Sequence, residues 1–582
     1  MAIIGIDLGT TNSVLAHYTE NGPVTINIDE SPLLPSVIHL ADSGFVVGKT
    51  AKNLLVLEPN LTVSSVKRKM GQDVVIPIGD KQLRPEELSS IILKKIRAVA
   101  VEQLKISEGE AIRTVITVPA YFSEEQRKST AEAAELAGLQ VERIINEPTA
   151  AALTYGMSNL EEAIFVVYDL GGGTFDVSVI ESDQGMVEVL ATTGNNQLGG
   201  DDFDHALANH IWDNFIKKNK LPNLEQDKFT TAKLIRLAEL AKINLSEQEE
   251  TAITESFFFQ HKNINYHIDQ TLKRSEFEGL IRSYIEQTVQ LLQQAVKEAK
   301  LSLQDMNGII LVGGSSRIPL VMEMIEKATN ILPQLIDNPD ESVAHGAAVQ
   351  GAIIDNKEIK TVLVDITPYS LGVGCLDSES EADMMKLVMN NLDHELTEDY
   401  VPNLRAEPLI RKNTPLPAKN KKIFYGGSPF QEKFKINVYQ GEKNRYDENK
   451  SIGECFLEVE NPPEDTKIEV SFHLDINGML NVEAKEIETN ATVQATFKSS
   501  RGQRIREDAL DNLVMATTDD STNLLVKRAK KLLEKKGLNE EDKSELEELL
   551  EGYQNAVLNN DTVSLENTTS QLADLLFFLE KN

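Results

Sequence analysis

A chain of 582 residues is long enough for several domains of ordinary size, each with its own buried core. The formal net charge of −33 argues against nucleic acid and membranes as partners, because no basic stripe locally reverses a charge that repels their phosphates. Cys375 and Cys455 lie far apart and no long apolar run occurs, so we expect no disulfide framework, no membrane span and a cytoplasmic location.

The N-terminal segment Gly5–Asn12 places Asp, Gly and Thr between two apolar strands, and Tyr168–Asp176 nearly repeats it. An alternating strand rather than a helix follows each motif, which predicts two hairpins and not P-loops. Glycines let backbone N–H groups approach a phosphate, Asp can serve Mg²⁺, and a Thr hydroxyl can donate to an oxygen. The pair predicts one phosphate held from two sides; the alternative is two hairpin turns without chemistry.

The segment Gly44–Thr50 resembles a Walker A loop. It has three residues instead of four between its glycines, so its backbone would not close around a phosphate as that motif requires. We expect a turn there.

Strands and helices alternate through the rest of the first part of the chain. A helix is predicted over Pro85–Leu104 and a strand over Thr114–Val118. Ser123 and Gln126 form a capping box for the next helix, which Gly138 would end. This alternation is typical of an α/β domain.

Three further turns carry polar residues. Asn146–Thr149 places a carboxylate at a predicted helix start, and Gly199–Asp202 is another glycine turn. Leu311–Pro319 has the pattern strand, turn and helix, where close backbone approach could hold a ribose or an α-phosphate. The Arg317 guanidinium in this turn could stack on a base.

The residue pattern changes after residue 358, where charged residues are followed by the apolar run Val362–Val364. Alternating strands follow, as in Lys433–Tyr439 and Lys467–Leu474, and from Ile505 onward the chain is helical and highly charged. We therefore predict four parts: residues 1–358, a linker over 359–366, a β-rich domain over 367–500 and a helical region over 501–582.

An acidic insertion over about 377–404 interrupts the β-rich part, with eight acidic residues and one lysine between positions 377 and 399. Such segments usually remain solvated at the surface. Met384, Met385 and Leu387 would also allow a short amphipathic helix.

These motifs, in this order, resemble the DnaK-type (seventy-kilodalton heat-shock) chaperone family over nearly the whole chain. Further blocks that look like the family's are Val118–Phe122, Val362–Gly372 and Asn437–Glu442. The shortened C-terminus is similar to that of the small bacterial HscC-type paralogues. The resemblance implies an actin-like two-lobed α/β ATPase, a β-sandwich that binds peptide and a short helical lid.

The resemblance also implies roles for single residues. Lys67, Glu147, Asp169 and Thr174 would be catalytic, with Asp7 and Asp169 holding Mg²⁺. The ATP or ADP site would comprise Gly9, Thr10, Thr11, Asn12, Gly171, Gly172, Gly173, Gly199, Gly200, Glu239, Lys242, Ser246, Gly313, Gly314, Arg317 and Asp340. Pro119, Arg127, Leu363 and Asp365 would transmit signals between domains.

Peptide binding is expected at Val373, Leu376, Phe424, Gly427, Phe434 and Ile436. Phe434 falls where the family usually has a smaller β-branched residue, which predicts a narrower central pocket. Alternatively, its ring turns into the sandwich core and leaves the pocket unchanged. The acidic insertion and the shortened lid also depart from the ordinary family pattern.

The implied function is that of an ATP-dependent chaperone that binds and releases extended hydrophobic segments of unfolded polypeptides during slow hydrolysis. Its implied partners are a J-domain co-chaperone and a nucleotide exchange factor. A small-molecule kinase or a filament-forming protein on the same ATPase fold is the alternative; the kinase would leave the β-rich and helical parts without a role.

Overall fold

The computed structural model describes residues 3–582 apart from 108–109, 157–161, 184, 223, 263, 337, 358, 360, 377–403, 428, 497–514, 516–523, 535–537, 559–563, 565–567, 570, 573–574, 577–578 and 580–582. The acidic insertion therefore lies outside the described residues, except for Leu404. None of the helices in the described part is both long and apolar enough to cross a bilayer.

The first lobe is built on a six-stranded sheet with the order β11-β10-β1-β2-β3, in which β4 also pairs with β2. Its strands are β1 (Ile4–Asp7), β2 (Asn12–Thr19), β3 (Gly22–Ile26), β4 (Leu34–Pro35), β10 (Ile112–Val118) and β11 (Leu139–Asn146). The helices α2 (Pro85–Leu104) and α3 (Glu124–Leu136) share a core with one face of this sheet. Helix α3 begins at the predicted capping box of Ser123 and Gln126.

Smaller elements extend this lobe. They are β5 (Ile38–Ala41), β6 (Gly44–Val47), α1 (Lys49–Leu57), β7 (Thr62–Val63), the 3-10 helix η1 (Val66–Lys69), β8 (Ile76–Ile78) and β9 (Lys81–Leu83). The turn expected over Gly44–Thr50 is wrong: β6 pairs with β5, and α1 begins directly after Gly48. The buried run Phe45–Val47 favours a strand, and Gly48 alone makes the reversal at φ 99°.

The second lobe repeats this plan around a six-stranded sheet with the order β18-β17-β12-β13-β14-β19. Its strands are β12 (Ala163–Leu170), β13 (Phe175–Asp183), β14 (Met186–Asn195), β17 (Gly308–Val312), β18 (Gln334–Leu335) and β19 (Val362–Val364). In both lobes an antiparallel hairpin, β1-β2 or β12-β13, lies beside a parallel strand, β10 or β17. The duplicated motif is thus a duplicated fold element, and both predicted hairpins are present.

The second sheet is accompanied by several helices and by a separate two-stranded hairpin that packs against one of these helices. They are α5 (Gly200–Asn219), α6 (Lys228–Glu247), α7 (Arg274–Glu298), η2 (Leu303–Asp305), η3 (Gly314–Arg317) and α8 (Pro319–Thr329), with the hairpin β15 (Glu250–His261) and β16 (Ile264–Lys273). The helices α4 (Glu147–Gly156) and α9 (Ser342–Ile354) share one core with Val115 of the first sheet and Val167 of the second. Their position between the sheets makes the two lobes one unit.

Two four-stranded antiparallel sheets follow, with the orders β21-β20-β23-β24 and β22-β25-β26-β27, and they enclose a common core. The strands are β20 (Leu371–Leu376), β21 (Leu404–Ile410), β22 (Ala418–Tyr425), β23 (Lys433–Gln440), β24 (Lys450–Glu458), β25 (Lys467–Leu474), β26 (Leu480–Glu486) and β27 (Thr492–Thr496), with η4 (Tyr446–Glu448) between β23 and β24. Gly478 makes the predicted turn before β26 at φ 76°.

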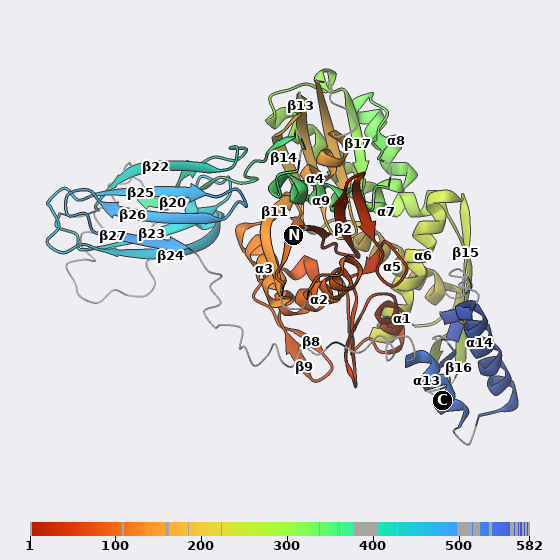
Figure 1. Ribbon diagram of the computed structural model, residues 1–582. Helices are drawn as coiled ribbons and strands as arrows, with labels where there is room; N and C mark the ends of the chain where they lie inside the picture. Colours follow the sequence, from red (N-terminus) through yellow and green to blue (C-terminus); the bar gives the residue numbers. More distant parts are fainter. Residues whose placement is uncertain are drawn as a thin grey trace.

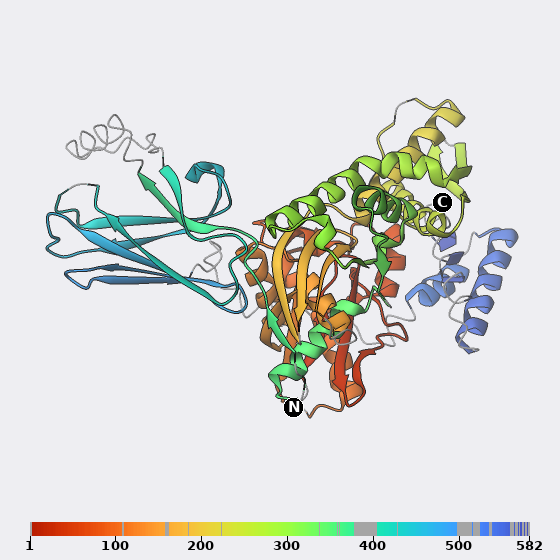
Figure 2. The ribbon, with the colours of Figure 1, turned by 90° about the horizontal axis from the view of Figure 1, so that it is seen from above.

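The helices α13 (Leu524–Leu533) and α14 (Glu540–Leu558) belong to the last part of the chain. Their buried leucines share a core with Leu54 and Leu57 of α1, and Arg528 pairs with Glu58 at 2.9 Å. The paired sheets and this helix pair lie on opposite sides of the two lobes in both views (Figure 1, Figure 2).

Candidate functional site

The two hairpins meet at their tips between the lobes. A Cβ on Gly172 would lie 1.8 Å from the Thr11 hydroxyl, and a Cβ on Gly173 would lie 2.5 Å from the methyl group of Thr10. Any larger residue at these two positions would force the tips apart. The Thr11 hydroxyl is buried and has no hydrogen-bond partner among the described residues, so it is available to a ligand oxygen.

A cleft of about 450 Å³ opens at this junction and collects most of the predicted nucleotide-site residues. It is lined by Asp7, Gly9, Thr10, Thr11, Asn12, Lys67, Glu147, Asp169, Gly171, Gly172, Thr174, Glu239, Lys242, Ser246, Gly313, Gly314, Arg317 and Asp340. Three predicted residues do not line the cleft but lie next to residues that do. They are Gly173 beside Thr10, Gly199 beside Gly172 and Gly200 beside Ser315.

The inner end of the cleft concentrates acidic groups around one cation. Lys67 is 5% exposed and is hydrogen-bonded to Glu147, which begins α4, and the Thr117 hydroxyl donates to Asp7 at 2.8 Å. Burial would lower the pKa of Lys67, but Glu147 and Asp7 outweigh it and raise the pKa above its ordinary value. Lys67 is therefore a fully charged ammonium in a buried site.

Burial raises the pKa of Glu147 to about 8, although Lys67 opposes that shift. The pKa of Asp169 is likewise raised well above its ordinary range, first by burial and then by Glu147 and Asp176. Burial also raises the pKa of Asp176 to about 7. A single lysine does not neutralise these carboxyl groups, so a further cation would relieve their repulsion.

The outer end of the cleft is less enclosed. Glu239, Lys242 and Ser246 project from successive turns of α6, and Lys242 pairs with Asp204 of α5 at 2.7 Å. Opposite them, Arg317 in η3 is half exposed and pairs with Asp340 at 2.9 Å. Gly314 lies close to Asp340, because a Cβ there would be 3.1 Å from the carboxylate oxygen. A flat polar ligand would fit between these two sides.

Three contacts across the lobes were not predicted. The Arg68 guanidinium donates to the two carboxylate oxygens of Asp202 at 3.0 and 2.8 Å. The Ser65 hydroxyl donates to Asp201 at 2.7 Å. The third joins Lys52 of α1 to Glu239 of α6 at 2.7 Å. The two aspartates of the Gly199–Asp202 turn could have indicated such contacts from the sequence. No motif around Ser65 or Arg68 indicates that these residues are their partners.

The strand β19 connects the lobes to the paired sheets, and it pairs in parallel with β14. The next residue, Asp365, accepts two hydrogen bonds from the Asn146 side chain, both at 2.8 Å. Arg127, predicted to transmit signals, also donates to Asn146 and is buried. The carbonyl oxygen of the predicted Pro119 accepts from the backbone of Phe122 at 3.1 Å. One region therefore contains Leu363, Asp365 and Arg127, next to Asn146, the residue that precedes Glu147.

Further contacts hold the paired sheets against the lobes. Lys412 pairs with Glu298 at 2.7 Å, and Lys450 pairs with Glu125 at 2.6 Å. The Glu124 carboxylate accepts the backbone N–H of Leu480 at 3.1 Å.

The predicted peptide-binding residues lie in the paired sheets, apart from the cleft. Val373, Phe434 and Ile436 are buried in the common core, and Phe424 packs against it. Leu376 lies beside Gly427, since a Cβ there would be 3.4 Å from the leucine methyl group.

The fold and the cleft define a two-lobed nucleotide-binding protein with a second, β-rich domain. The chain matches the Hsp70 protein family over residues 3–78, 72–388 and 400–581. It is 40% identical to the chaperone protein DnaK of Mycoplasma mobile over 506 residues, 86% of this chain and 78% of that protein. It is 38% identical to the chaperone protein DnaK of Halobacterium salinarum over 516 residues, 88% of this chain and 77% of that one.

The chain therefore belongs to the Hsp70 family. It is an ATP-dependent molecular chaperone, and its enzymatic activity is ATP hydrolysis. A small-molecule kinase and a filament-forming protein are not favoured.

Proposed function

We propose that Lys67 is the residue that stabilises the charge that develops during ATP hydrolysis. The observation that carries this proposal is that the buried Lys67 ammonium lies among the carboxyl groups of Asp7, Glu147 and Asp169 in the inner cleft. Positioning and charge neutralisation dominate phosphoryl transfer, and a preorganised cation supplies both. Glu147 orients Lys67 through their hydrogen bond, and Thr174 lines the same end of the cleft.

A magnesium ion fits this end of the cleft. The described residues contain no group of three or more His, Cys, Asp or Glu side chains arranged to hold a metal by themselves. Mg²⁺ usually takes only one or two carboxylates and completes its octahedron with water and phosphate oxygens, so Asp7 and Asp169 suffice. When bound, the ion would neutralise charge on the nucleotide's phosphates. The excess of buried carboxyl groups over Lys67 supports this assignment.

The remaining groups of the cleft bind the nucleotide. Thr10, Thr11 and the glycine tips of both hairpins present hydroxyl and backbone donors to the phosphates. Glu239, Lys242, Ser246, Arg317 and Asp340 hold the adenosine between α6 and η3.

Substituting Lys67 tests the proposal. We expect Lys67→Ala to retain ATP binding but to lose single-turnover hydrolysis by a factor of about 100 or more, the range for a lost transition-state charge contact. Lys69→Ala is the matched control, because Lys69 belongs to the same 3-10 helix but is exposed. Near wild-type hydrolysis by Lys67→Ala, with folding verified by ATP binding, contradicts the proposal.

We also propose that residues 367–500 bind extended hydrophobic segments through Val373, Leu376, Phe424, Gly427, Phe434 and Ile436. Residues 1–358 would form the ATPase, 359–366 the linker and 501–582 the helical lid. Docking of the linker at β14 and the contact of Asp365 with Asn146 support coupling between the two sites. A J-domain protein and an exchange factor would regulate this cycle in the cytoplasm, where free Cys375 and Cys455 stay reduced.

A further inference from the structure

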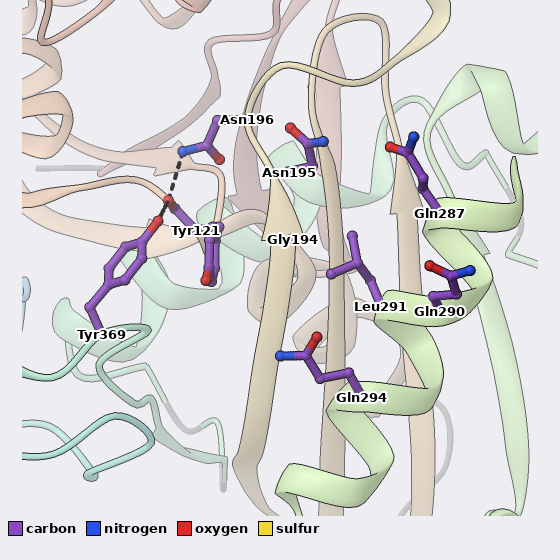
Figure 3. A pocket seen from close by; sticks show the side chains of 9 residues that line it. All are labelled: Tyr121, Gly194, Asn195, Asn196, Gln287, Gln290, Leu291, Gln294 and Tyr369. Atoms are coloured by element: carbon purple, nitrogen blue, oxygen red, sulfur yellow. Dashed lines mark hydrogen bonds between the residues drawn. The ribbon is translucent and has the colours of Figure 1, made fainter. Parts of the chain in front are cut away.

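A second pocket, of about 430 Å³, lies where the two lobes and the paired sheets meet (Figure 3). Tyr121, just after β10, comes from the first lobe. The end of β14 and one side of α7 come from the second lobe, and Tyr369 precedes β20. No residue of this pocket lines the nucleotide cleft.

The lining of this pocket is neutral and rich in amides. Gln287, Gln290 and Gln294 project from α7 opposite Asn195 and Asn196, and the tyrosines lie beyond them at one end (Figure 3). Leu291 adds an apolar patch. The described lining residues carry no charge, but charged groups lie next to them. Lys412 pairs with Glu298 and is 5.7 Å from the centroid of the Tyr121 ring, and Asp176 accepts the backbone N–H of Tyr121 at 3.0 Å.

One polar atom of the lining is buried without a partner among the described residues, the Oδ1 of Asn196. The side chains of Gln287 and Gln290 are exposed at the opening of the pocket, where a ligand would replace their contacts with water. The Nδ2 of Asn196 donates to the Tyr121 carbonyl at 2.7 Å, which fixes the orientation of the amide. Gln294 donates to Glu298 at 2.8 Å and keeps its carbonyl free. The pocket thus presents both donors and acceptors without net charge.

We propose that this pocket binds a neutral polyhydroxylated ligand of the size of a mono- or disaccharide. A nucleotide or a carboxylate would find no cationic partner in the lining. Hydroxyl groups both donate and accept, so they match free amides, and the tyrosine rings and Leu291 can cover a sugar's apolar face. The tyrosine side chains lie together at one end of the pocket (Figure 3), and a volume of about 430 Å³ suits a compact ligand better than a long peptide chain.

Binding of this ligand would be coupled to the docking of the paired sheets on the two lobes. Tyr369 belongs to the part that follows β19, and its hydroxyl donates to the Tyr121 carbonyl at 2.9 Å. The pocket is therefore complete only while the paired sheets are docked, so a ligand that contacts Tyr369 stabilises the docked arrangement by mass action.

Saturation-transfer NMR on the full-length protein, with maltose, trehalose and sucrose as probes, tests the proposal. We expect transfer from at least one sugar with a dissociation constant of roughly millimolar order, weakened about three- to tenfold by Gln290→Leu. The control is Gln293→Leu, which changes an exposed glutamine of the same helix that does not line the pocket. The undocking variant Leu363→Asp should also weaken sugar binding severalfold.

Each contrary result removes a defined part of the proposal. Absence of transfer from all three sugars, or equal affinity for wild type and Gln290→Leu, overturns the site. Preferential binding of a blocked tripeptide such as acetyl-trialanine amide overturns the ligand class. Unchanged sugar affinity in Leu363→Asp overturns the coupling to docking.

Discussion

Replacing Leu363 by Asp should undock the linker from the second lobe. Leu363 pairs with Val187 in the β14-β19 ladder and packs, half buried, against the core that contains α4 and α9. Half of a leucine's full burial is worth about 1 kcal/mol, and an unpaired carboxylate in that place costs roughly another 1–2 kcal/mol. The total of about 2–3 kcal/mol shifts the docking equilibrium by roughly 30- to 150-fold. Asp365 and Glu188 nearby add repulsion to the new charge.

The assay is ATP-triggered release of a fluorescent peptide, followed by stopped flow, with nucleotide affinity measured in parallel. We expect Leu363→Asp to lose most of the ATP response at unchanged nucleotide affinity. The matched control is Val362→Asp, because Val362 is the preceding residue of the same strand but 62% exposed. Normal release by Leu363→Asp, or an equal loss in Val362→Asp, would refute the role of the buried face of β19.

Three further substitutions test other parts of the structure. Phe434→Val should tighten binding of a Leu-centred peptide about ten- to a hundredfold in anisotropy titrations if the ring narrows the pocket; lower stability without that gain would assign the ring to the core in which it is buried. Lys52→Ala should speed release of fluorescent ADP by no more than about fivefold, because the Lys52 side chain is 41% exposed and such ion pairs contribute about 1 kcal/mol at most; a hundredfold change would contradict this estimate. His39 has its pKa lowered from 6.5 to about 4 by burial and then by Arg528, so its contribution to stability is full above pH 6.5 and is lost as the pH falls. Between pH 7 and 4.5 the wild type should therefore lose about 2 kcal/mol more unfolding free energy than His39→Gln, as measured by calorimetry, and equal losses would exclude His39 as the cause.

The elements that the sequence predicts well are those whose cause is local. The capping box at Ser123, the turn at Gly478 and the two hairpins depend on a few adjacent residues, and the structure contains all of them. Because the hairpins repeat, they also indicated that their tips would face each other. The prediction of a turn over Gly44–Thr50 was wrong because the apolar residues that follow Gly44 are buried and form the strand β6.

Contacts between distant segments could not be predicted in the same way. Arg68 and Asp202 are 134 residues apart, and Asn146 and Asp365 are separated by 219. No periodicity links such pairs, because tertiary packing alone brings them together. The amide-lined pocket is a stronger example, since its residues come from four separate segments and none of them has a motif.

If the helices α13 and α14 serve as the proposed lid, then Leu54 and Leu57 of α1 compete with the bound client for them. The helix pair α13-α14 buries its apolar side against Leu54 and Leu57, on the side of the lobes opposite the paired sheets (Figure 2). The same apolar side could not cover a peptide at the same time, so closure of such a lid would first have to break the contact with α1. Client retention would then depend on a partition between two docking places, and weakening the α1 contact, for example with Leu57→Ser, should lengthen the lifetime of the client complex without changing the peptide pocket.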